Sequence, residues 1–190
     1  ALRGSGYPNA WQTISLLRET SGWVVRDHAE WLPPNARLWH LAKESWFHHI
    51  WSLIRIVKGG CTQAFIAVAA TRKGEKLYLP YPAPFTLFWL SLLPTKWRPY
   101  CIADAYISIW DAMFRDRSTG RSDSAISRAV KWFEGRSLRA ATVVLVDTEA
   151  NRQQFIVDFN LDVRRVRSIP LAIDQRLFTE QTATSRVSKP

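Results

Sequence analysis

The sequence predicts the α/β fold class, with a doubly wound, mainly parallel sheet and flanking helices. The clearest observation lies near the C-terminus. There the apolar strand Thr142–Val146 runs through a polar turn into a short helix, then into a second strand that ends at Pro170. Two further short strands, over Lys76–Leu79 and Arg98–Asp104, are separated by another helical stretch. Parallel strands joined by helices cross over with a right-handed sense, so this alternation favours a Rossmann-like sheet. The chain has 190 residues and is 47% hydrophobic, which suffices for the core of one such domain.

The elements expected along the rest of the chain follow from apolar spacing and from glycine and proline positions. In order, we expect a helix over Ala10–Glu19, a short strand from Trp23, a long helix from Asn35 that breaks at Gly59 and Gly60, and helices over Thr62–Thr71, Phe85–Leu93 and Ala125–Arg139. In the last of these, Ser124 is the expected N-cap, and the residues expected to face inward are Ile126, Ala129, Val130 and Phe133.

The charge balance indicates an anionic partner. The chain carries 26 Lys and Arg against 16 Asp and Glu, a formal net charge of +10. Nucleic acid, nucleotide-sugar phosphates and an acidic membrane leaflet could each supply the opposite charge, and a merely basic protein remains the alternative. Ten tryptophans favour the membrane surface, because indole prefers the headgroup interface, although tryptophan is also a common core residue. No apolar run approaches the roughly twenty residues that span a bilayer, and the first residues do not resemble a signal peptide.

Neither cysteine nor histidine indicates a metal or a disulfide framework. Cys61 and Cys101 lie far apart without a C-x-x-C motif, and the four histidines lack metal-ligand spacing. We therefore expect free thiols, no metal and no bound cofactor.

Two segments resemble a known enzyme family. The stronger one begins at Glu134 with EGRSLRAATVVLVDTEANRQQF and continues to Phe178. Its last part matches the pattern V-x-x-I/V-P-x-G-V/I-D-x-x-x-F, except that Ala172 stands where glycine is usual. The second segment comprises LYLPYPAP and IADAYISIWDAMFRDR. Together they resemble the N-terminal domain of family 4 glycosyltransferases.

The resemblance implies half of a GT-B fold, in which two Rossmann-like domains face each other across a cleft. Residues 1–178 would form the acceptor-side domain. Residues 179–190 would be a polar linker or tail leading towards a C-terminal donor-binding domain, or the donor half would be a separate subunit. The implied activity is transfer of a sugar from a nucleotide sugar to a glycan or lipid-linked acceptor, with retention of configuration. The nucleotide sugar is then a substrate, and the chain alone is expected to be inactive.

Candidate catalytic residues follow the strand that ends near Asp104. The carboxyl ends of strands in an open α/β sheet line the ligand crevice, so Asp104 is the first candidate for contacting the acceptor hydroxyl. Asp111 is the second catalytic candidate, and Tyr106 is a candidate for substrate binding. Arg115 and Arg117 could pair with a phosphate of donor or acceptor, while pairing with neighbouring aspartates is the alternative.

Two other segments are candidates for substrate binding. Gly4, Ser5 and Gly6 stand where the family has a glycine-rich turn, whose backbone amides could bind the donor diphosphate. An ordinary turn is the alternative, because the third glycine of a dinucleotide fingerprint is absent. Thr148 and Glu149 end the later strand and point towards the same crevice, unless they only cap the helix that follows.

A second reading from another class is a non-catalytic, Rossmann-like interaction module that binds a protein partner. A nucleic acid partner is not expected, because no recognised motif supports one. The expected location is the cytoplasm, with a peripheral position at the inner face of the membrane left open.

Overall fold

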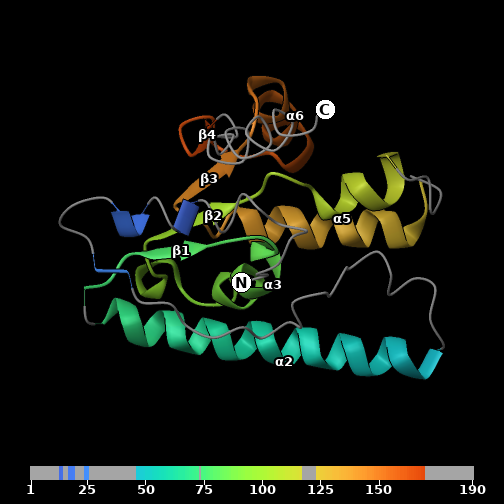
Figure 1. Ribbon diagram of the computed structural model, residues 1–190. Helices are drawn as coiled ribbons and strands as arrows, with labels where there is room; N and C mark the ends of the chain where they lie inside the picture. The colour runs from blue at the N-terminus through green and yellow to red at the C-terminus, as the bar shows by residue number, and fades with distance from the viewer. Residues whose placement is uncertain are drawn as a thin grey trace, which may run out of the picture.

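The computed structural model describes residues 13–14, 17–19, 24–25, 46–72, 74–116 and 123–169, with only the backbone described over 46–53 (Figure 1). Several sequence predictions lie outside these residues. They are the glycine turn Gly4–Gly6, the first part of the long helix expected from Asn35, Arg117, and the segment from Pro170 to the C-terminus, including the domain boundary at 178.

A four-stranded parallel sheet forms the centre of the described fold. Its strands are β1 (Leu77–Leu79), β2 (Cys101–Asp104), β3 (Val143–Val146) and β4 (Val166–Ser168). They lie side by side in the order β1-β2-β3-β4, and each neighbouring pair is parallel. The predicted α/β class with a mainly parallel sheet is therefore confirmed. The strand order of the described sheet runs in one direction, so the reversal that defines double winding is not among these strands and stays a prediction.

The helices pack on one another in a continuous series beside the sheet (Figure 1). They are α2 (Trp46–Thr71), α3 (Ala83–Ser91), the short α4 (Ile109–Asp111) with a π-helical turn at Ala112–Asp116, α5 (Ala125–Leu138) and α6 (Glu149–Phe159). A 3₁₀ turn covers Thr95–Trp97. Helix α3 contacts both α2 and α5, and α5 contacts α6. Because consecutive parallel strands lie side by side, right-handed crossovers place α3, α5 and α6 on one face of the sheet.

The predicted helix break at Gly59 and Gly60 is wrong. Helix α2 continues through both glycines. Gly60 is buried, and a Cβ added there would lie 2.6 Å from the carbonyl oxygen of Phe85 on α3. Glycine at this position therefore lets two helix backbones approach closely rather than ending a helix.

The core lies between the strands and the inner faces of α3 and α5. Its fully buried apolar side chains include Leu87, Leu90, Cys101, Ala103, Leu138, Val144, Val146 and Val166. In the part of the chain that the structure describes, no helix is long and apolar enough to cross a membrane.

The predicted inner face of α5 is wrong at two positions. Ile126 is 69% exposed and Ala129 is exposed, whereas Val130 and Phe133 are half-buried. The buried residues of this helix include Ser127, Glu134 and Ser137, which are polar. Hydrophobic spacing could not identify this face, because its polar groups are buried through specific hydrogen bonds.

Candidate functional site

Asp104 ends β2, beside the carboxyl end of β1. Its carboxylate accepts a hydrogen bond from the hydroxyl of Tyr78 on β1 (3.1 Å) and another from the backbone N–H of Tyr106 (3.2 Å). The side chain of Thr13 also forms a hydrogen bond with Tyr78. The predicted candidates Asp104 and Tyr106 are thus brought together, and Tyr78 is a neighbour that the sequence analysis missed.

Burial controls the ionisation of this group. It raises the pKa of Asp104 to about 6, against the two hydrogen bonds that favour the carboxylate. Burial and the neighbouring carboxylate of Asp104 raise the pKa of Tyr78 above its ordinary value. The pKa of Tyr106 is also raised, first by burial and then by the charges of Asp104 and Asp147. Asp104 at the end of β2 and Asp147 directly after β3 thus lie near the phenol of Tyr106.

Asp104 is 1% exposed and both its oxygens accept hydrogen bonds. In this conformation it holds Tyr78 and the turn at Tyr106 in position. A direct contact with an acceptor hydroxyl would require one of these partners to move. The catalytic role of Asp104 stays a prediction.

Thr148 and Glu149 begin α6, just after β3. The hydroxyl of Thr148 accepts a hydrogen bond from the backbone N–H of Asn151 (3.1 Å), so Thr148 is the N-cap of α6. Glu149 is exposed in the first turn, where hydrogen bonds from Arg152 and Gln153 lower its pKa. Both residues have the capping positions that the sequence analysis gave as their alternative role, and substrate binding by them stays a prediction.

A second polar cluster lies around α4, and its centre is Glu134. The carboxylate of this residue on α5 accepts hydrogen bonds from the backbone N–H groups of Ile109 and Trp110, both at 2.8 Å, and from the hydroxyl of Ser108 at 3.0 Å. Glu134 is 1% exposed, and burial raises its pKa to about 7 despite these hydrogen bonds. The sequence analysis did not select Glu134. The only feature of the sequence that could have pointed to Glu134 is its position at the start of the family-like segment.

Trp110 connects this carboxylate with a set of cations. Its indole N–H donates to the hydroxyl of Ser127 at 2.8 Å, and the ring is buried. The ammonium of Lys131 lies 4.1 Å from the ring centroid, and the guanidinium of Arg115 lies 4.8 Å from it. Cation–π attraction therefore adds to the hydrogen bonds that hold α4 against α5.

Asp111 and Arg115 form an ion pair with each other, and Arg115 also forms one with α6. Arg115 bonds Asp111 at 3.2 Å and Asp158 at 3.1 Å, and Asp158 also pairs with Lys131 at 3.0 Å. The side chain of Asp111 is 31% exposed, so it is more accessible than Asp104. The two predicted catalytic aspartates therefore belong to different hydrogen-bond networks. Arg–Asp pairing, the alternative reading of Arg115, is the arrangement that the structure has.

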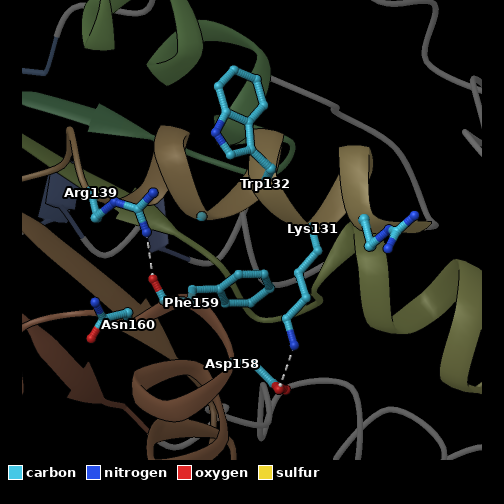
Figure 2. Close-up of a pocket in the computed structure, with 8 residues that line it drawn as sticks. Lys131, Trp132, Arg139, Asp158, Phe159 and Asn160 are labelled. Atoms are coloured by element: carbon cyan, nitrogen blue, oxygen red, sulfur yellow. Dashed lines mark hydrogen bonds and ion pairs between the residues drawn. The ribbon is translucent and has the colours of Figure 1, made fainter. Parts of the chain in front are cut away.

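A shallow depression of about 250 Å³ lies between α5 and α6 (Figure 2). Two of its three basic residues are engaged: Lys131 pairs with Asp158, and Arg139 donates to the carbonyl of Phe159 at 2.7 Å, while the third, Arg128, is exposed. The positive charge around the depression is thus partly neutralised by these contacts. Over the described ranges, no group of three His, Cys, Asp or Glu side chains is placed to hold a metal ion.

Comparison with known proteins leaves the family assignment open. No protein-family model, curated protein or solved structure matches the chain. The resemblance to family 4 glycosyltransferases therefore rests on the two sequence segments alone.

Proposed function

We propose that the chain is the acceptor-binding half of a GT-B glycosyltransferase that uses a nucleotide sugar. The single observation that carries this proposal is the order α5–β3–α6 over the stronger family-like segment. Glu134 opens that segment on α5, and Thr148 and Glu149 follow β3 at the N-terminus of α6. This is the helix–strand–turn–helix order that the resemblance requires.

Asp111 is the carboxylate best placed to meet an acceptor. It follows β2, is partly exposed, and belongs to the short helix whose N–H groups Glu134 holds. Its partner Arg115 is 47% exposed and could exchange its carboxylate partner for an acceptor phosphate. In this proposal Asp111 accepts a hydrogen bond from the acceptor hydroxyl, and the departing diphosphate takes the proton, so no strong enzymatic base is needed. Asp104 then keeps a structural role at the strand end.

The proposal requires a donor-binding domain, and the DNA sequence of the gene tests whether one is encoded. We expect the reading frame beyond Pro190, or an adjacent frame, to encode a second Rossmann-like domain with a basic residue and a spaced glutamate pair for the nucleotide sugar. The 190-residue chain with that domain should release nucleoside diphosphate from a panel of nucleotide sugars when acceptors are present. Transfer by the 190-residue chain alone would contradict the half-enzyme assignment.

The acceptor half is tested by ligand-observed NMR with oligosaccharides and polyprenyl-phosphate-linked sugars. The Asp111→Asn variant should lose roughly tenfold in acceptor affinity, because one charge-assisted hydrogen bond is weakened. Asp162→Asn is the matched control, since Asp162 is exposed and pairs only locally with Arg164. Equal affinity of both variants would remove Asp111 from the site.

The alternative is a non-catalytic interaction module. It is favoured by the burial of Asp104 and by the ion pair of Asp111 with Arg115, which leave both carboxylates already partnered. This reading predicts a stable protein complex and no binding of sugars or nucleotide sugars. Affinity purification together with the NMR panel separates the two readings.

A further inference from the structure

Helices α3 and α5 share an aromatic outer surface. On α3 the side chains of Phe85, Phe88 and Trp89 are half-buried, and Leu92 at its C-cap is exposed, whereas Leu87 and Leu90 are buried in the core. The helix, with the sequence APFTLFWLS, contains no charged residue. Helices α2 and α5 both pack against α3, and the part of α3 that they leave uncovered presents apolar groups, where a helix on a protein surface ordinarily carries polar ones.

Helix α5 adds an exposed tryptophan with arginines around it. Trp132 is 57% exposed. Arg128 and Arg136 lie four residues before and after it, so helical spacing places both on its side of α5. The guanidinium of Arg136 lies 5.8 Å from the indole centroid, and Arg128 is exposed.

This outer face of α5 carries only positive charge. The sole acidic residue within the helix is Glu134, which is buried and bonded to α4. The arginines therefore have no carboxylate from their own helix beside them. Such a face is complementary to a negatively charged surface.

The aromatic groups of the two helices form one continuous patch. The ring centroids of Phe88 and Trp132 lie 6.2 Å apart in an edge-to-face arrangement, and those of Phe88 and Phe133 lie 5.1 Å apart. Phe88 also contacts Trp89, at 6.2 Å. Figure 2 shows the indole of Trp132 directed away from Lys131 and Asp158, whereas Arg139 is directed towards α6, where it donates to the carbonyl of Phe159.

We propose that this aromatic–arginine surface, formed by Phe88, Trp89, Leu92 and Trp132 with Arg128 and Arg136, docks on an anionic lipid bilayer. Indole and phenyl groups settle at the boundary between headgroups and acyl chains, and arginine binds lipid phosphate through its planar donors. The absence of a carboxylate on the outer face of α5 and the net charge of +10 favour an anionic leaflet over a neutral one. This proposal does not depend on sugar transfer, because the surface is separate from the strand ends.

The test is co-sedimentation of the full 190-residue chain with vesicles. We expect binding to vesicles that contain phosphatidylcholine and phosphatidylglycerol, and much weaker binding to phosphatidylcholine alone. Added salt should weaken the binding, because exposed charges are screened. Equal binding to both vesicle types, or none to either, would overturn the proposal.

Two pairs of variants locate the surface. Arg128→Glu should lower the partition coefficient by roughly tenfold or more, since each cation near the membrane contributes about 1 kcal/mol. Arg167→Glu makes the same charge change at an exposed position on β4 and should cost much less. Trp132→Ser should lower binding by about tenfold, whereas Val157→Ser, at an apolar position that is 79% exposed on α6, should not. Losses of similar size in the variants and their controls would contradict a localised surface.

Folding and self-association are checked on the same samples. Far-UV circular dichroism should be unchanged in all four variants, because each substituted side chain is at least half exposed or at the surface. Size-exclusion chromatography tests the other occupant of an apolar face, a second copy of the chain. A dimer that Trp132→Ser dissociates would assign the patch to self-association and overturn membrane docking.

Discussion

The carboxylate of Glu134 on α5 accepts a hydrogen bond from the backbone N–H of Trp110, at 2.8 Å, and so ties α5 to the loop after β2. It accepts a second from Ile109 and a third from Ser108, so one buried carboxylate satisfies the free donors at the start of α4. The indole of Trp110 in turn bonds Ser127 on α5. The position of Asp111, the next residue, therefore depends on a side chain 23 positions further along the chain.

Replacing Glu134 with Gln tests this dependence. The amide keeps the shape but offers one acceptor oxygen in place of two, so a buried N–H loses its partner. We expect the free energy of unfolding to fall by about 1–3 kcal/mol, measured by urea denaturation. Glu149→Gln is the control, because Glu149 is exposed, and its effect should be much smaller. Equal losses in both variants would refute the buried cap.

The two buried carboxyl groups predict a pH dependence of stability. Burial raises the pKa of Glu134 from 4.5 to about 7 and that of Asp104 from 3.8 to about 6. The folded state therefore binds more protons than the unfolded state between these values, and the free energy of unfolding should fall as the pH rises from about 5 to 7.

Urea denaturation at a series of pH values measures this slope. The Glu134→Gln variant should have a flatter slope, because one of the two titrating groups is removed. Asp162→Asn should keep the wild-type slope, since ion pairing with Arg164 lowers the pKa of the exposed Asp162 and moves its titration to more acidic pH. If the free energy of unfolding of Glu134→Gln varied with pH as steeply as that of the wild type, groups other than Glu134 would be responsible for the pH dependence.

Gly60 should not tolerate a side chain. Alanine is the better helix former by about 1 kcal/mol, but its Cβ would lie 2.6 Å from the carbonyl oxygen of Phe85. We expect Gly60→Ala to lower the free energy of unfolding by about 1–3 kcal/mol, because the two helices must move apart. Thr62→Ala, at an exposed position of the same helix, should be neutral or stabilising. A stabilised Gly60→Ala variant would show that α2 and α3 do not approach so closely.

Asn160 ends α6 in the left-handed region, with φ 50° and ψ 57°. Asparagine and glycine adopt this conformation more readily than alanine does. Asn160→Ala should therefore cost about 1 kcal/mol of stability, whereas Asn160→Gly should change it little, as measured by thermal denaturation. The reverse order would indicate a different end to the helix.

Much of the fold could be predicted from local sequence. The strands β1 to β4 and the helices α3, α5 and α6 lie where their apolar runs indicated, and Ser124 and Thr148 cap α5 and α6. The inner face of α5 could not be predicted, because Ser127 and Glu134 are buried by hydrogen bonds to distant residues. Hydrophobic spacing carries no information about such partners.

Some properties of the candidate site could likewise be predicted from local sequence, and others depended on the tertiary structure. Sequence placed Asp104 at a strand end and Asp111 in the loop that follows, because strand length and loop composition are local properties. Only the tertiary structure decided that Asp104 is buried against Tyr78 while Asp111 stays partly exposed beside Arg115. It also decided that Gly60 lets α2 pack closely against α3 rather than ending a helix. Accessibility, ionisation and close approach depend on neighbours far along the chain, and these exist only after folding.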